Sequence, residues 1–157
     1  AGGGHAAMLA LAARDRAGPK IAFQWLIYPM LDDRTGSTRA VSPWQGEYIW
    51  SAKSNRYGWS SLLGVPAGSD EVPGEAVPGR REDLSGLPPT FIATLSLDLF
   101  LDENLRFAAA LSGQGVAVDC VVQSGGYHGM DIFAPDAPSA RRFTRQLVNG
   151  LKRGLAA

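Results

Sequence analysis

The sequence is poor in several features that would point to particular classes of protein. It contains one cysteine, Cys120, so no disulfide can form within the chain, and we expect a reducing, cytoplasmic location. Its 15 basic and 15 acidic residues give a formal net charge of zero, which leaves no electrostatic reason to bind nucleic acid or an anionic membrane. No apolar run approaches the roughly 18 residues of a transmembrane helix. These observations argue against a nucleic-acid-binding protein, a membrane-spanning protein and a protein held together by internal disulfides.

Residues and motifs that carry chemistry are also scarce. Only two histidines occur, His5 and His128. The sequence has no Gly-x-Ser-x-Gly elbow and no His-Gly-Gly-Gly element, and no Lys-Ser or Lys-Thr comes after the glycines at positions 2–4 to make a phosphate loop. Since His5 has no second ligand nearby, we expect neither a metal site nor a cofactor.

Three nearly continuous apolar runs stand out, over residues 20–31, 90–97 and 116–122. Continuous rather than alternating apolarity indicates strands that are covered on both faces, as in a parallel sheet. Cys120 lies inside the third run, where we expect it to be a small buried hydrophobic residue.

Helical patterns alternate with these runs. They cover residues 5–16, the stretch from Asp102 to Leu111, and the stretch from about Pro138 to Leu155. Alternation of helices with apolar strands predicts an α/β fold in which a parallel sheet carries helices on its faces. The chain of 157 residues has the length of one domain.

The segment from about 36 to 86 has a different composition, rich in proline, glycine and serine and with many aromatic residues in its first half. Its aromatic side chains either line a hydrophobic substrate pocket or pack a small insertion onto the core. The residues concerned are Trp44, Trp50, Tyr57 and Trp59. We expect an insertion on the substrate side of the domain, with an irregular loop over 64–81.

The most informative stretch is 123–133, in which His128 is flanked by glycines just after an apolar run. A lone histidine there could be a surface-loop residue, but Asp98 occupies the corresponding place after the preceding run. Because active-site groups gather at the carboxyl ends of parallel strands, we expect the two side chains to meet. An aspartate that accepts a hydrogen bond from one imidazole nitrogen fixes the tautomer of the ring. The other nitrogen then serves as a general base toward a serine hydroxyl.

Four stretches of the chain, taken together, resemble the carboxyl-terminal portion of the hormone-sensitive-lipase family of α/β-hydrolases, the bacterial esterases. Residues 1–10 are similar to the segment directly after the nucleophilic serine of that family, and Tyr28-Pro-Met-Leu-Asp-Asp33 is similar to the strand end before its substrate-binding segment. The stretches 97–103 and 127–129 are similar to its acid and histidine elements. The match covers most of the chain.

The resemblance implies a serine carboxylic-ester hydrolase that acts through an acyl-enzyme on short or medium acyl esters. Asp98 would be the triad acid, His128 the base, and the backbone N–H of Ala1 an oxyanion-hole donor. The four aromatic residues of the insertion would border the substrate pocket. Leu95 and Leu99 depart from the family, which often has glycine and proline at these places.

The nucleophile itself is missing from these residues, and the resemblance places it immediately before Ala1. The sequence opens on Ala-Gly-Gly-Gly-His without an initiator methionine, so we expect a piece of a longer enzyme. Its partners would be a small ester substrate and the missing amino-terminal half, or else further copies of the chain. The alternatives are a binding module that has lost its nucleophile, and an amidase or lactonase of the same fold.

Overall fold

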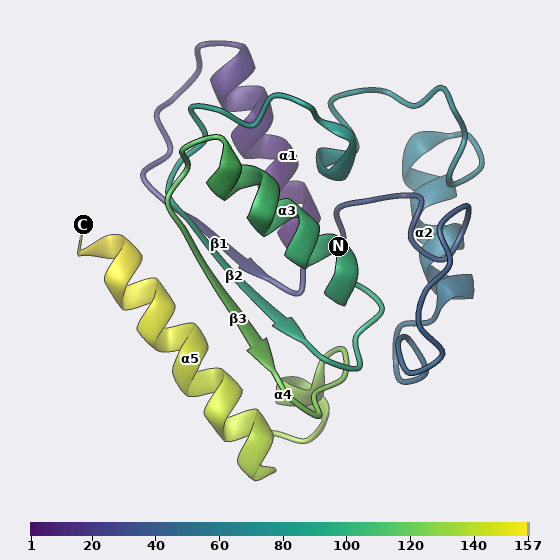
Figure 1. Ribbon diagram of the computed structural model, residues 1–157, viewed down its shortest axis with the longest axis vertical. Coiled ribbons are helices and arrows are strands. Elements are labelled where there is room, and N and C mark those ends of the chain that lie inside the picture. The colour runs from purple at the N-terminus through teal and green to yellow at the C-terminus, as the bar shows by residue number, and fades with distance from the viewer. Residues whose placement is uncertain (157) are drawn as a thin grey trace.

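A sheet of three parallel strands runs through the molecule (Figure 1). The computed structural model describes residues 1–156. The strands are β1 (Gln24–Ile27), β2 (Thr90–Leu95) and β3 (Val118–Gln123), in the spatial order β1-β2-β3. All six residues of β2 are buried because this strand has a neighbour on each side and helices on both faces. The expected parallel sheet with flanking helices is confirmed.

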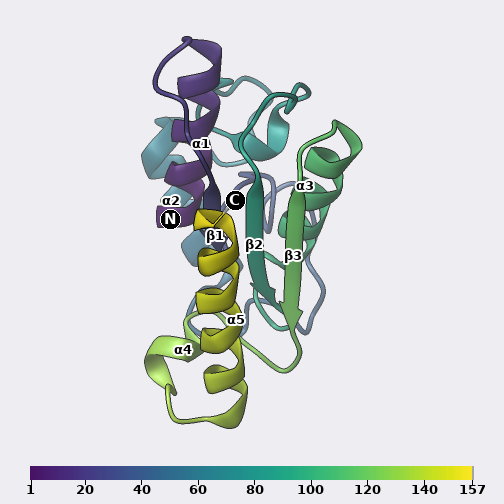
Figure 2. The ribbon, with the colours of Figure 1, turned by 90° about the vertical axis from the view of Figure 1, so that its left-hand side faces the viewer.

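The helices form two layers, one on each face of the sheet (Figure 2). The helices α1 (Gly2–Asp15) and α3 (Leu101–Gly113) cover one face, where Leu26 and Ile92 join their apolar residues in one core cluster. The helix α5 (Pro138–Leu155) covers the other face. Its bounds agree with the predicted ones.

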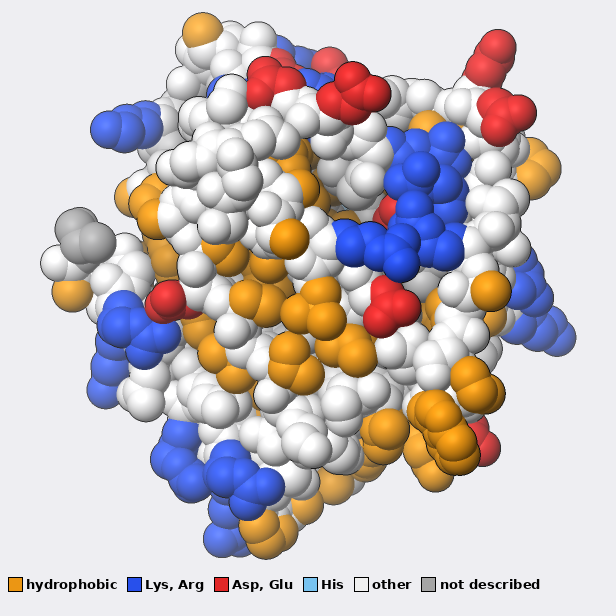
Figure 3. Space-filling model, in the orientation of Figure 1, with side chains coloured by type: hydrophobic (Ala, Val, Ile, Leu, Met, Phe, Trp, Pro, Cys, Tyr) orange, Lys and Arg blue, Asp and Glu red, His pale blue; other side chains and the backbone are white. Residues whose placement is uncertain are grey.

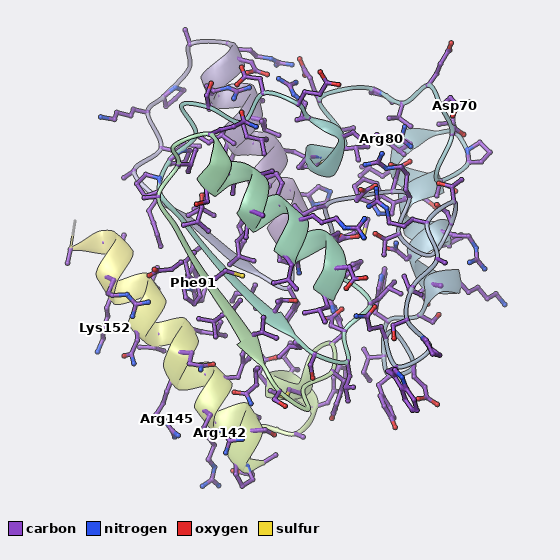
Figure 4. All side chains as sticks on the ribbon, in the orientation of Figure 1. Asp70, Arg80, Phe91, Arg142, Arg145 and Lys152 are labelled. Carbon is purple, nitrogen blue, oxygen red and sulfur yellow. The ribbon has the colours of Figure 1, made fainter. Side chains whose placement is uncertain are left out.

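The side of the sheet under α5 shows why glycine is needed in a helix. Phe91, Ala93 and Leu95 alternate along β2 and point to this side, and Phe91 lies between the sheet and α5 (Figure 4). A Cβ added at Gly150 would approach the Phe91 ring to 2.6 Å. Gly150 therefore lets α5 lie close enough to the sheet to bury that ring.

The first helix begins earlier than its sequence pattern suggested, at Gly2 rather than at residue 5. The reason is close packing against the segment after β1. A Cβ at Gly3 would lie 2.9 Å from the Cβ of Pro29, and one at Gly4 would collide with the carbonyl oxygen of Met30. The glycines are thus packing residues, and they bring the amino end of α1 beside the carboxyl end of β1.

The strand expected over residues 20–31 is shorter in the structure, because β1 pairs only along Gln24–Ile27, with Thr90 to Ala93 of β2. Trp25 and Ile27 are only half-buried. Within the described residues no strand pairs with the second edge of β1. The N–H and C=O groups on that edge are consequently without sheet partners.

The segment between β1 and β2 contains a helix that the sequence pattern did not reveal, α2 (Ala52–Leu63). The Ser51 side chain caps its start by accepting a hydrogen bond from the Ser54 N–H at 3.2 Å. Gly64 ends it with a φ of +72°, a conformation that glycine adopts without strain. The only other helical element that the structure describes in this segment is the short turn η1 (Pro78–Arg80).

The expectation that Cys120 is buried is wrong. Cys120 is exposed, as is Val122 on the same face of the strand. Both belong to β3, which is an edge strand of the sheet, and α3 leaves this part of its surface open. No helix among residues 1–156 has the length and apolarity needed to cross a lipid bilayer.

Candidate active site

Asp98 and His128 meet at the carboxyl ends of β2 and β3. The Nδ1 atom of His128 lies 2.8 Å from Oδ2 of Asp98, whose residue is fully buried. The two loops that carry them are joined by backbone hydrogen bonds. The N–H of Ser96 donates to the Gln123 carbonyl at 3.1 Å, and the N–H of Leu97 donates to the Gly126 carbonyl at 2.8 Å. The contact expected from strand-end positions is therefore present, and the backbone holds it in place.

The second oxygen of Asp98 is also engaged. Oδ1 accepts a hydrogen bond from the Phe100 N–H at 3.0 Å, which fixes the plane of the carboxylate. Because an ionised carboxylate only accepts hydrogen bonds, the proton of the imidazole lies on Nδ1. The lone pair is then on Nε2, the nitrogen that faces away from Asp98. Such an imidazole can take a proton from a hydroxyl group.

Three aromatic rings surround the imidazole. The ring centroid of Tyr28 lies 4.6 Å from that of His128. That of Phe100 lies 5.5 Å away, with the two ring planes at 79°, and that of Trp50 lies 6.1 Å away. These rings come from the end of β1, the start of α3 and the segment before α2. Since 16% of the His128 side chain is exposed, the imidazole is partly open to a ligand between apolar walls.

Tyr28 also anchors the loop of His128. Its hydroxyl donates a hydrogen bond to Oδ1 of Asp131, at 3.2 Å, in the one-turn helix α4 (Met130–Phe133). Burial raises the pKa of Tyr28, and the negative charge of Asp131 raises it further, so the hydroxyl keeps its proton. The backbone of Tyr28 has a φ of +33°, a strained conformation for this residue type. Strain of this kind gathers at functional sites, where it costs about 1–3 kcal/mol.

The amino end of α1 belongs to the same region, as Figure 1 shows near the end of β1. The backbone nitrogen of Ala1 lies within the electrostatic field of the Asp98 carboxylate. The first N–H groups of α1 have no side-chain cap. The positive end of a helix dipole stabilises a negative charge that develops next to it.

Comparison with known proteins identifies the family of the chain. A family model described as the alpha/beta hydrolase fold matches residues 1–132. The chain belongs to the α/β-hydrolase family. The resemblance to hormone-sensitive-lipase-type esterases is confirmed, because curated relatives of the family are named as esterases and carboxylesterases.

Three relatives illustrate the extent of the similarity. The chain is 33% identical to Esterase LipI of Mycobacterium tuberculosis over 156 residues, which are 97% of this chain and 47% of that protein. It is also 33% identical to Carboxylesterase NlhH of the same species, covering all of this chain and 49% of the relative. The solved structure of a bacterial heroin esterase superposes with a TM-score of 0.85 at 31% identity, over 98% of this chain and 49% of the other. The chain thus spans about half the length of the relatives it matches.

The four aromatic residues expected at a substrate pocket lie in different environments. Only Trp50 approaches His128. Trp44 and Tyr57 are 75% and 78% exposed. Trp59 is fully buried in a core cluster with Met30, Val77, Leu99 and Phe100. Trp59 thus packs α2 onto the domain, which is the second of the two interpretations that the sequence left open.

Sequence reasoning missed Tyr28 and Phe100 as parts of the site. A signal was present for Tyr28, since it comes directly after β1 just as Asp98 and His128 come after the ends of β2 and β3. Ser96 does not hydrogen-bond the imidazole, and its Oγ instead accepts a hydrogen bond from the Gly125 N–H at 2.8 Å. Within residues 1–156, the only hydrogen bond of the imidazole is the one to Asp98.

Proposed function

We propose that the protein containing this chain hydrolyses carboxylic esters through an acyl-enzyme, with Asp98 as the acid of a catalytic triad and His128 as its base. The observation that carries the proposal is the 2.8 Å contact between the His128 imidazole and the fully buried Asp98. The esterase names of the relatives support it.

In this mechanism His128 takes the proton of a serine hydroxyl on Nε2 while the serine attacks the ester carbonyl. The Asp98 carboxylate keeps the proton on Nδ1 and stabilises the imidazolium that forms. His128 then gives the proton to the leaving alcohol, and a water molecule repeats the sequence on the acyl-enzyme. The serine precedes Ala1, and the Ala1 N–H at the start of α1 donates to the oxyanion.

The substrate class is inferred from the surroundings of the imidazole. Tyr28, Phe100 and Trp50 form apolar walls next to His128, and their ring centroids lie at most 6.1 Å from that of the imidazole. Apolar walls bind hydrocarbon chains and exclude water from the reacting carbonyl. We therefore assign short or medium acyl esters as substrates.

The unpaired edge of β1 supports the presence of a further half of the enzyme. An exposed strand edge is a template for pairing, because its backbone groups lack partners. We infer that the strand leading to the nucleophile pairs with this edge, so that the serine reaches the end of β1 and the neighbouring amino end of α1. Pairing between copies of the chain is the alternative for the same edge.

Replacement of His128 by alanine in the complete protein tests the proposal. We expect kcat for an aryl ester to fall by several orders of magnitude. The remaining rate should exceed that of the reaction in water by about 10³–10⁴-fold, which is the acceleration left without a triad member. The matched control is His5→Ala, because His5 is exposed on α1 and is the only other histidine of the chain. Near-normal turnover in a folded His128→Ala variant would mean that His128 is an ordinary loop residue without a catalytic role.

A further inference from the structure

A cleft lies away from the Asp98–His128 pair and shares no residue with it. It has a volume of about 220 Å³ and lies between α3, the loop after β1 and the segment after η1. Its lining includes four arginines, Arg34, Arg39, Arg81 and Arg106. Figure 3 shows basic side chains gathered on the side of the molecule that carries α3. Four cations converging on one cleft require a source of negative charge.

The acids of the chain supply only part of that charge. Asp32 lines the cleft and accepts hydrogen bonds from Arg34 and Arg39, at 2.6–2.8 Å. Arg81 pairs with Asp15 at 2.6 Å. Arg106 has no ion pair and no side-chain hydrogen bond with any of the residues that the structure describes. The cleft therefore has unmatched positive charge, with Arg106 as its free cation.

Glu103 provides a second, independent feature. It lines the cleft, and only 3% of the residue is exposed. Its Oε1 accepts hydrogen bonds from the N–H groups of Leu31 and Asp32, at 2.6 and 3.3 Å. Its Oε2 is buried and makes no hydrogen bond within 3.5 Å among residues 1–156, although the Thr35 side chain lies close enough to act on the carboxylate. A buried carboxyl oxygen without a close partner is unusual, and it has hydrogen-bonding capacity left for a group that enters the cleft.

The protonation of Glu103 agrees with an anionic occupant. Burial raises the pKa of Glu103 to about 8, although the Leu31 N–H and the nearby Thr35 side chain oppose the shift. At neutral pH the side chain is then an uncharged acid that can donate a hydrogen bond. A cleft with four arginines and an uncharged acid has hydrogen-bond donors and positive charge but few free acceptors.

We propose that this cleft binds a small oxyanion of the phosphate class. The planar guanidinium group matches the oxygens of a phosphate group in a two-pronged fashion, and a cleft lined by one sign of charge concentrates its field. One water takes up about 30 Å³ in the liquid, so a cleft of this size accommodates an oxyanion with part of its hydration shell. Inorganic phosphate and the phosphate group of a small ester are the two sources of this chemistry.

Titration calorimetry of the complete protein with sodium phosphate at constant ionic strength tests the proposal. We expect saturable binding of one phosphate per chain. Replacing Arg106 by glutamine removes a charge-assisted contact and should weaken binding about tenfold or more. The matched control is Arg145→Gln on α5, since Arg145 projects from the outer side of that helix (Figure 4).

A second pair of variants places a negative charge in the cleft without changing the arginines. Ala110 lines the cleft and is exposed on α3, so Ala110→Glu should abolish phosphate binding. The neighbouring Ala109 is exposed but does not line the cleft, and Ala109→Glu should bind phosphate as the unmodified protein does. Tighter binding of phenyl phosphate than of phosphate would identify a phosphate ester as the ligand, and equal binding would identify free phosphate. Absence of saturable binding, or equal affinity in Arg106→Gln and the unmodified protein, would overturn the proposal.

Discussion

The backbone N–H of Leu97 donates to the carbonyl oxygen of Gly126 at 2.8 Å, and this bond joins the loop of Asp98 to the loop of His128. The two residues are neighbours of the proposed acid and base, one and two positions away along the chain. Their bond extends the pairing of β2 with β3 beyond the last residues of the strands. The distance between the imidazole and the carboxylate is consequently set by backbone geometry as well as by the side chains themselves.

Gly126→Ala should therefore reduce both activity and stability. A Cβ at position 126 would lie 2.7 Å from Cδ2 of Leu95 and 3.1 Å from the Met130 side chain, so the loop of His128 must shift. A shift of about 1 Å in a catalytic group can cost about 100-fold in rate, and overpacking costs about 1–3 kcal/mol of stability. The measurements are kcat for an aryl ester and the free energy of unfolding of the complete protein.

The control for this variant is Gly113→Ala, at the end of α3. A Cβ there meets nothing within 4 Å, so neither kcat nor stability should fall. If Gly126→Ala kept the full kcat, the backbone tie between Leu97 and Gly126 would have no part in placing His128.

The meeting of Asp98 and His128 could be predicted because it depends on short-range signals. Each residue comes after an apolar strand, and strands in a parallel sheet end on the same side. The same reasoning did not extend to Phe100, and Trp50 was predicted only as one of four aromatic residues; the rings of both reach the imidazole through the packing of α2 and α3 on the sheet. Contacts of that kind depend on tertiary structure, which the order of residues in one segment does not contain.

The helix α2 was missed although its capping residues were visible. Ser51 and Gly64 are ordinary helix boundary residues, but the stretch between them is polar on average and has only two buried residues, Asn55 and Trp59. A helix with so narrow a buried face has little hydrophobic periodicity for a sequence pattern to detect. The short length of β1 has a different cause: β2 begins only at Thr90, opposite Gln24, and the chain leaves the extended conformation at Tyr28, whose φ is +33°.

Glu103→Gln should make stability less dependent on pH. The pKa of Glu103 is about 8 in the folded protein, against a reference of 4.5, because burial disfavours the charged form and the Asp32 charge adds to this effect. Between these values the folded state holds a proton that the unfolded state has lost. The free energy of unfolding therefore falls as pH rises, by at most about 1.4 kcal/mol per pH unit.

Chemical denaturation of both proteins from about pH 5 to about pH 9 measures this effect. We expect the Gln variant to gain stability relative to the unmodified protein up to about pH 8, and the difference to stay constant above it. Glutamine keeps an oxygen that can accept the hydrogen bonds of Leu31 and Asp32, so the variant should fold. Parallel pH curves would show that Glu103 is ionised in the folded state at neutral pH.

Trp50→Ala should change the preference for acyl chain length, whereas Trp44→Ala should not. The Trp50 ring lies 6.1 Å from the imidazole, but Trp44 is 75% exposed. A methylene in an apolar pocket is worth about 1–3 kcal/mol of discrimination. The ratio of kcat/KM for long and short acyl esters is the quantity to compare among the variants.

Trp59→Ala belongs to the same series and should act differently. Because Trp59 is fully buried, its truncation should cost about 3–5 kcal/mol of stability and leave the chain-length ratio of the remaining folded protein unchanged. A flat ratio in the Trp50 variant would assign Trp50 to packing as well, and Tyr28 and Phe100 would then be the remaining walls of the pocket.

Residues 1–157 produced alone should neither hydrolyse esters nor remain monomeric. The edge of β1 has no partner strand within the described residues, and unpaired N–H and C=O groups on a strand edge promote association. His128 in turn has no serine hydroxyl within hydrogen-bond distance in this part of the chain, so it has no group to deprotonate. Light scattering of the purified chain and an aryl-ester assay measure both properties. Production together with the amino-terminal half should restore activity and lower the mass per particle, because the added strand pairs with β1. An active monomer of the 157 residues alone would place the nucleophile within this chain, and the assignment of the serine to the position before Ala1 would have to be abandoned.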